Sequence, residues 1–177
     1  DVHHIIADGV SLGIIVEEFV QLYAGQELAD LPIQYKDYAV WQQQADVQAH
    51  LKQQANYWLD QMQGELPILE LPTDDPRPSV QQFTGDRYGF QLSKEQTERL
   101  QQLAKHQEVT PYMLLLAVYH LLLFKYTGQS DQIVGMPVAG RSHADIEEMI
   151  GMFVNTLAIR NQPKAEHTFE EFLSQVK

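Results

Sequence analysis

The sequence predicts an α/β fold, because segments with two different hydrophobic periods alternate along it. Apolar residues recur at helical spacing in several segments, whereas short β-branched or continuous apolar runs indicate strands. A single stretch that contains four prolines separates an earlier set of these elements from a later one. We therefore expect two groups of helices and strands joined by an extended connection.

Composition excludes several classes of protein. The formal net charge of −12 argues against a nucleic-acid partner, since binding to phosphates needs a basic face. The chain has no cysteine, which excludes disulfides and thiol catalysis and fits a cytoplasmic setting. No apolar run approaches the length of a membrane span. We expect the chain to be an internal part of a longer protein, because it opens on a motif and stops within a helical pattern.

The opening residues carry the first candidate site. Residues 2–7 have the β-branched content of a short buried strand, and Asp8 and Gly9 predict a turn. Neighbouring side chains on a strand point to opposite faces, so His3 and His4 cannot both reach one site, and we expect one to face a cleft and the other the scaffold. An imidazole at a strand end suits general acid–base chemistry. The alternative is a structural strand with one packed and one solvent-facing histidine.

Helical patterns follow this stretch. Residues 11–24 predict an amphipathic helix that Gly25 ends, and its apolar stripe predicts a packed face. Tyr35, Tyr38 and Trp41 then share one face of a further helix, which is more typical of a core than of a binding surface.

The middle of the chain changes character. A second helical stripe covers residues 51–62, and the prolines between residues 67 and 78 predict an extended connection. Residues 87–92 alternate enough to predict a strand. Ser93 opens a capping box, so we expect a helix over residues 94–106.

A strongly apolar segment follows. Thr110 and Pro111 predict the start of a helix, and residues 113–126 are apolar on nearly every side, which predicts burial. His120 lies within this helix and is predicted to be a packed core residue. The short apolar run at residues 132–138 predicts a strand.

The last third holds two candidate polar residues. Arg141, in a predicted loop, could hold a carboxylate or a phosphate, and the alternative is a surface salt bridge. Residues 150–160 predict a strand with one polar break at Asn155. A buried amide needs partners, so Asn155 is predicted either as a structural hydrogen-bonding residue or as a residue facing a cleft. Thr168 opens the capping box of a final helix.

Three of these stretches resemble, in the same order, the motifs of condensation domains from nonribosomal peptide synthetases. Acyltransferases built like chloramphenicol acetyltransferase share the looser His-x-x-x-Asp-Gly pattern but lack the second and third motifs. The matching stretches are His-His-x-x-x-Asp-Gly at residues 3–9, Tyr-x-Asp-Tyr-Ala-x-Trp at 35–41 and Ile-Gly-x-Phe-x-Asn-Thr-x-x-x-Arg at 150–160.

The resemblance implies a chloramphenicol-acetyltransferase-like, two-lobed α/β sandwich that this chain covers only in part. Residues 1–65 are then expected to be the end of the N-terminal lobe with the double-histidine motif. Residues 66–87 are expected to be a proline-rich crossover, and residues 88–177 the first part of the C-terminal lobe.

The resemblance also implies site residues. In the family the second histidine of the motif is catalytic, which points to His4 and leaves a structural role for His3. The aspartate of the motif is described as paired to an arginine in an upstream motif that this chain lacks, so we expect Asp8 to be without its usual partner. Gly9 is expected to line the cleft through its backbone N–H, and Asn155 to lie near the active channel. No metal is implied.

The implied reaction is amide formation, in which the amine of an acceptor aminoacyl thioester attacks a donor acyl or peptidyl thioester. Both groups are carried on phosphopantetheine by peptidyl carrier proteins, so the domain itself needs no bound cofactor, and an adjacent adenylation domain is a further expected partner. An α-amino group has a pKa of about 8, so positioning, a proton acceptor and charge stabilisation suffice. His4 is either the base or a positioning group.

Other classes remain open at this stage. A carrier-docking module with the same fold would bind without catalysis. A coenzyme-A-dependent acyltransferase would need a basic pocket for its nucleotide, and an epimerization domain shares the double histidine.

Overall fold

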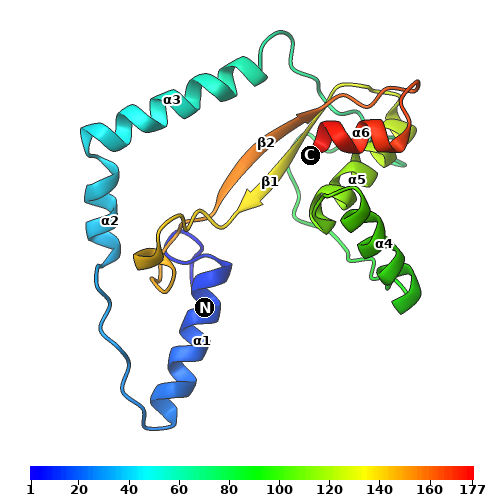
Figure 1. Ribbon diagram of the computed structural model, residues 1–177. Coiled ribbons are helices and arrows are strands. Elements are labelled where there is room, and N and C mark those ends of the chain that lie inside the picture. Colours follow the sequence, from blue (N-terminus) through cyan, green and yellow to red (C-terminus); the bar gives the residue numbers. More distant parts are fainter. The chain divides into compact units, whose positions relative to one another are not determined.

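The computed structural model describes residues 1–177 (Figure 1). The contacts within the chain divide it into two compact units. The first unit contains Asp1–Gly64 and Val134–Ile159. The second contains Glu65–Ile133 and Arg160–Lys177. Each unit therefore combines segments that lie far apart in the sequence.

The first unit carries three α-helices and a 3-10 helix, which are α1 (Gly9–Tyr23), α2 (Tyr35–Gln42), α3 (Ala45–Gln61) and η1 (Ala144–Ile146). Helix α1 begins where Asp8 caps it, because the Asp8 side chain accepts a hydrogen bond from the Ser11 N–H. A small apolar core joins the two segments of this unit, and it consists of Ile146, Met149 and Phe153 with Ile33 and Tyr38 packed against them.

The second unit is built on α4 (Lys94–His106), α5 (Pro111–Thr127) and α6 (Phe169–Val176). Helix α5 packs against both α4 and α6. The predicted helix starts are confirmed, because the Ser93, Thr110 and Thr168 side chains each accept a hydrogen bond from a backbone N–H of their own first turn. The buried core of this unit consists of Ala104, Leu114, Ala117, Phe172 and Leu173.

Two strands, β1 (Gln132–Val138) and β2 (Asn155–Asn161), are hydrogen-bonded to each other and run antiparallel (Figure 1). Strand β1 has the predicted bounds. Strand β2 begins five residues later than the predicted strand at 150–160, because the backbone of Gly151 and Phe153 is hydrogen-bonded to the side chains of Ser11 and Asp8.

Two predicted strands are wrong. Residues 2–7 form a turn and irregular backbone instead of a strand, and residues 87–92 are irregular too. A strand needs a neighbour for its backbone groups, and neither segment pairs with another strand here. The first segment satisfies its backbone groups locally, since the Ile6 N–H donates to the His3 carbonyl at 3.1 Å.

Two predictions of burial also need correction. The apolar stripe of α1 is exposed rather than packed, with Val16 and Phe19 63% and 65% exposed. Helix α5 is buried only on one face, which consists of Leu114, Ala117, His120 and Leu123. The sequence patterns located both helices correctly. No element of this chain covers their exposed apolar faces.

No single helix is long and apolar enough to cross a membrane. Helices α4 and α5 satisfy the length and composition requirement only as a pair, and that pair is bent by 102°.

Candidate active site

The centre of the first unit is a buried ion pair between Asp8 and Arg141. The Arg141 Nη2 lies 3.1 Å from the Asp8 Oδ1, and the two side chains are 5% and 3% exposed. The upstream arginine that was expected as the usual partner of Asp8 is absent from this chain, but Asp8 is paired all the same, with an arginine later in the chain. Of the two alternatives for Arg141, the structure supports the carboxylate-binding one, since the pair is buried rather than on the surface.

Asp8 accepts further hydrogen bonds that stabilise its charge. The Ser11 N–H donates to Oδ1 at 2.8 Å, and the Phe153 N–H donates to Oδ2 at 3.1 Å. Burial is the largest single influence on the Asp8 pKa and raises it. The hydrogen bonds from Ser11, Phe153 and Arg141 together outweigh burial and hold the pKa of this carboxyl well below its usual range. The carboxylate is therefore charged at neutral pH.

Arg141 also organises the segment around η1. Its Nη1 donates to the carbonyls of Ile146 and Met149, both at 2.6 Å, and to that of Glu147 at 3.2 Å. Its guanidinium carbon lies 4.3 Å from the centre of the Phe153 ring, which is a cation–π distance. Arg141 thus connects Asp8, near the end of the first motif, to the backbone of Ile146 and Met149 and to the Phe153 ring.

Ser11 is the second buried connection in this unit, and its side chain is fully enclosed. The hydroxyl lies within hydrogen-bond distance of the Asp8 Oδ1 (2.8 Å) and the Arg141 Nη2 (2.9 Å). It is also 2.8 Å from the Gly151 carbonyl oxygen and 3.0 Å from the Gly151 nitrogen. We call Asp8, Ser11, Arg141, Gly151 and Phe153 the Asp8–Arg141 cluster.

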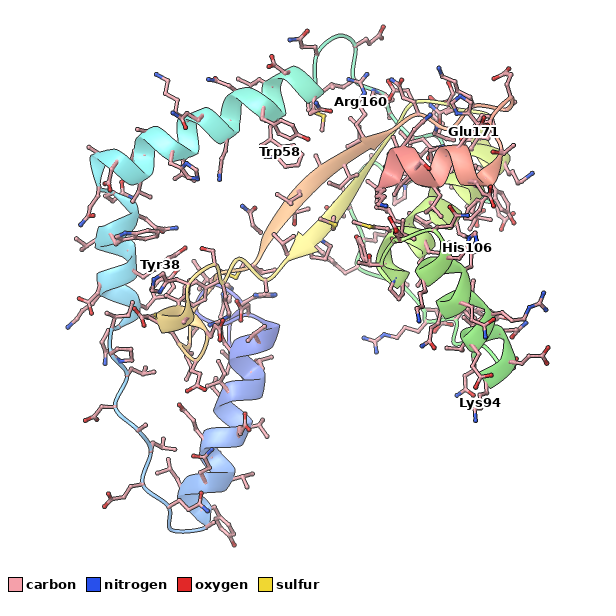
Figure 2. The ribbon with its side chains drawn as sticks, viewed as in Figure 1. Tyr38, Trp58, Lys94, His106, Arg160 and Glu171 are labelled. Carbon is pink, nitrogen blue, oxygen red and sulfur yellow. The ribbon has the colours of Figure 1, made fainter.

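The second motif packs on the same cluster. The rings of Tyr35 and Tyr38 lie 5.3 Å and 5.0 Å from the Phe153 ring, and Tyr38 projects from α2 toward the segment around η1 (Figure 2). The Tyr35 hydroxyl donates to the Met152 carbonyl at 3.1 Å. A Cβ on Gly151 would overlap the Tyr35 ring, so any larger residue at this position would force the Tyr35 ring to move. All three predicted motifs therefore meet in the first unit, apart from Arg160, the last residue of the third motif, which belongs to the second unit.

The histidines lie on the turn before this cluster. Both His3 and His4 are exposed, so the expectation that one faces the scaffold is wrong in this chain. The His3 Nδ1 accepts a hydrogen bond from the Ile5 N–H at 3.1 Å. Because only residues 5–7 separate His4 from Asp8, the buried carboxylate determines where the His4 turn is attached.

The remaining predicted residues are less constrained. Asn155 is the first residue of β2 and is exposed, so the expectation of a buried amide is wrong, and its Oδ1 accepts a hydrogen bond from the Thr156 N–H at 2.8 Å. Gly9 is the first residue of α1 and is exposed, and a Cβ there would meet nothing within 4 Å. The structure brings Asp8 together with its cluster, whereas His3, His4 and Asn155 lie outside these contacts.

Sequence reasoning missed Ser11 and the partner of Asp8. A signal for Ser11 was present, since a hydroxyl three residues after an aspartate N-cap lies in the first turn of the helix beside that carboxylate. The pairing of Arg141 with Asp8 had no local signal, because 133 positions separate the two residues.

The first unit has a pocket beside the Asp8–Arg141 cluster, since Tyr38 and Ile146, which line it, contact Phe153 and Arg141. This pocket of about 270 Å³ is lined by aromatic, apolar and acidic side chains, none of which is a predicted site residue: Ile33, Asp37, Tyr38, Trp41, Ser142, His143, Asp145 and Ile146. No group of three or more His, Cys, Asp or Glu side chains is arranged to hold a metal ion.

Comparison with known proteins defines the class. The family model described as condensation domain matches residues 1–177, and the chain belongs to the condensation domain family. Among curated proteins, the chain is 55% identical over its whole length to tyrocidine synthase 3 of Brevibacillus parabrevis. It is 54% identical over its whole length to surfactin synthase subunit 1 of Bacillus subtilis (strain 168). The chain spans only 3% and 5% of those two proteins.

Solved structures show the same architecture. The X-domain from teicoplanin biosynthesis matches 99% of this chain with a TM-score of 0.87 and 26% identity, and the match covers 41% of that chain. A four-domain nonribosomal peptide synthetase bound to AMP and glycine matches 99% of this chain with a TM-score of 0.85 and 27% identity, over 13% of its own length. The fold is thus the chloramphenicol-acetyltransferase-like α/β fold of condensation domains, of which this chain covers a part.

Proposed function

We propose that this chain is the part of a condensation domain that carries the catalytic turn of a nonribosomal peptide synthetase. The observation that carries the proposal is the Asp8–Arg141 cluster. In it, Asp8 of the first motif accepts a hydrogen bond from the Phe153 N–H of the third and pairs with Arg141. Ser11 accepts one from the Gly151 N–H, and Tyr35 of the second motif packs on the Phe153 ring. Parts of three motifs distant in sequence are thus gathered around one buried carboxylate, directly or through Phe153, at the base of the turn that holds His4.

The proposed reaction forms one amide bond. The acceptor amine attacks the carbonyl carbon of the donor thioester, a C–N bond forms, and the C–S bond to the donor phosphopantetheine breaks. The amine loses a proton and the departing thiolate gains one. His4 has the chemistry to accept the amine proton or to orient the amine, and an exposed imidazole on a fixed turn suits either role.

Supporting roles are proposed for other residues. His3 shapes the turn, since its Nδ1 accepts a backbone N–H within it. Gly9 offers its backbone N–H at the start of α1, where an aligned amide favours developing negative charge. Asn155 is proposed to lie beside the reaction channel in the complete domain.

The proposed lobe organisation keeps residues 1–65 as the end of the N-terminal lobe, 66–87 as the crossover and 88–177 as the first part of the C-terminal lobe. The structure adds one feature to this scheme, because Val134–Ile159 packs with Asp1–Gly64 in one compact unit. We infer that this segment extends from the second lobe toward the catalytic turn of the first.

The proposed partners are donor and acceptor peptidyl carrier proteins that bring phosphopantetheine-bound substrates, together with an adjacent adenylation domain. The similarity to tyrocidine synthase 3 and surfactin synthase subunit 1 supports this assignment. Antibiotic or lipopeptide biosynthesis in the cytoplasm is the corresponding setting. We propose that the chain by itself is inactive, since it spans about two fifths of the matched X-domain structure.

The test is dipeptide formation by the complete domain that contains this chain, with two separately loaded carrier proteins. Appearance of a dipeptide on the acceptor carrier supports the proposal. Carrier binding without transfer would indicate the docking-module alternative. Acyl transfer from coenzyme A in the absence of carriers would indicate a coenzyme-A-dependent acyltransferase, and inversion at the α-carbon without bond formation would indicate an epimerization domain.

A further inference from the structure

We propose that Ser11 is a positioning residue for His4. Its buried hydroxyl holds the catalytic turn against the third motif, so that losing it displaces the imidazole even when the protein stays folded. This inference rests on the proposed function, because it assumes that His4 acts in the transfer step. Ser11 itself does not touch the substrates in this account.

The hydroxyl of Ser11 is fully used by its neighbours. A serine hydroxyl can accept two hydrogen bonds and donate one. The Gly151 N–H and the Arg141 Nη2 donate to it, at 3.0 Å and 2.9 Å. Its single proton is left for either the Asp8 Oδ1 or the Gly151 carbonyl oxygen, both at 2.8 Å.

Few other side chains can replace this hydroxyl. Alanine would leave the Gly151 N–H without its acceptor and remove one of the acceptors of Arg141, in a place where water has no access. Cysteine would keep the approximate shape but supplies only a weak donor and a weak acceptor. Ser11 therefore does more than fill space, because it bridges the start of α1 to residue 151, which lies 140 positions away.

The position of His4 depends on this bridge through a short connection. Asp8 caps α1 through the Ser11 N–H, and the His4 turn leads directly into Asp8. The Asp8–Arg141 pair fixes the carboxylate, but the Ser11 hydroxyl is the group that ties the first turn of α1 to the Gly151 backbone. Without it, α1 and the turn before it can shift relative to Gly151, and displacement of a catalytic group by about 1 Å can cost about a hundredfold in rate.

A double-mutant cycle tests this coupling in the complete domain. Single-turnover transfer between two loaded carriers is measured for the parent, Ser11→Ala, His4→Ala and the double variant. We expect Ser11→Ala to slow transfer by about tenfold to a hundredfold in the parent background. We expect it to add no further slowing in the His4→Ala background. Ser142→Ala, an exposed serine of the same unit, is the matched control and should leave the rate unchanged.

Each outcome decides between the explanations. If Ser11→Ala slows transfer by the same factor in both backgrounds, Ser11 acts through general folding and the inference is wrong, while the role of His4 stands. If His4→Ala transfers at the parent rate, the catalytic assignment fails and the positioning role fails with it. Should Ser11→Ala not fold, the cycle is run with Ser11→Cys, and equal slowing in both backgrounds would again overturn the inference.

Discussion

The carboxylate of Asp8 and the guanidinium of Arg141 lie 3.1 Å apart although 133 positions separate them in the sequence. Both side chains are almost completely buried. A buried pair of this kind is costly to break, because the remaining partner becomes an uncompensated charge. We therefore regard the pair as the main determinant of where the turn that carries His4 is attached.

Replacing Asp8 with asparagine should strongly destabilise the first unit. The change keeps the size of the side chain but leaves the Arg141 guanidinium buried without its counter-charge, which typically costs about 3–5 kcal/mol. Urea unfolding of the complete domain measures the loss.

The matched control for this prediction is Glu98→Gln, which removes an exposed pair with Lys94 on α4. Such surface pairs contribute about 0–1 kcal/mol, so the control should change the free energy of unfolding very little. Equal effects of the two variants would show that burial of the Asp8–Arg141 pair is unimportant.

Gly151→Ala should disrupt the contact between the second and third motifs. The added Cβ overlaps the Tyr35 ring and comes within 2.8 Å of the Phe153 ring, so these rings must move. Overpacking of this kind costs about 1–3 kcal/mol. Gly13→Ala is the matched control, because its Cβ meets nothing within 4 Å on α1, and alanine in a helix is favoured over glycine by about 1 kcal/mol. A stability change of the same sign and size in both variants, measured by thermal unfolding, would contradict this account of Gly151.

The second unit should lose stability as the pH falls below about 6.5, the ordinary pKa of histidine. His120 is fully buried between Gln132 and Asn161, with its Nδ1 2.9 Å from the Gln132 Oε1 and its Nε2 3.0 Å from the Asn161 Nδ2. These partners suit a neutral ring with its proton on Nδ1. Burial lowers the pKa of His120, and the Gln132 hydrogen bond offsets this only in part.

The sign of the effect follows from proton binding. Below pH 6.5 the unfolded chain takes up a proton at His120 that the folded chain binds more weakly, so unfolding becomes easier as the pH falls. We expect the urea midpoint to decrease between pH 7.5 and pH 5.5, and His120→Gln to flatten that dependence. Replacing the exposed His143 with glutamine is the control and should leave the dependence intact. A parent midpoint that is constant over this range would contradict the burial of a neutral His120.

The outward face of α5 should behave differently in the isolated chain and in the complete domain. Leu115 and Leu122 are 52% and 49% exposed here, although Leu114 on the opposite face is buried. We expect Leu115→Lys with Leu122→Lys to reduce association of the isolated chain, measured by sedimentation, without loss of helix content. In the complete domain the same pair should lower the melting temperature, because the segments outside this chain are expected to cover that face.

A contrasting variant checks the assignment of the two faces of α5. Leu114→Ala should destabilise both the isolated chain and the complete domain, by about 2–5 kcal/mol. If the lysine variants leave the complete domain as stable as its parent, this face is exposed there too, and our account of it is wrong.

Local patterns predicted the helices well. The capping boxes at Ser93 and Thr168 and the Thr110-Pro111 start depend on contacts within one helical turn, so the sequence alone locates them. The buried His120 was predicted for a related reason, since its neighbours in the same helix are apolar on nearly every side.

Strands and long-range pairs were predicted less well. Residues 2–7 have strand-like composition, but a strand forms only where a neighbour accepts its backbone hydrogen bonds. The partner of Asp8 was missed because nothing near Arg141 in the sequence indicates which carboxylate it will meet. Asn155 was expected to be buried from its apolar neighbours, yet it lies exposed at the start of β2, where the strand has only one partner.

The most direct test of the proposed function compares His4→Ala with His3→Ala in single-turnover transfer by the complete domain, with the folding of each variant checked separately. We expect His4→Ala to slow transfer by about 10²–10⁴-fold if His4 is the general base. We expect His3→Ala to act mainly on stability, since the His3 ring accepts a backbone N–H within the turn. Well-folded His4→Ala that transfers at the parent rate across neutral pH would contradict the account, because His4 would then be neither base nor positioning group.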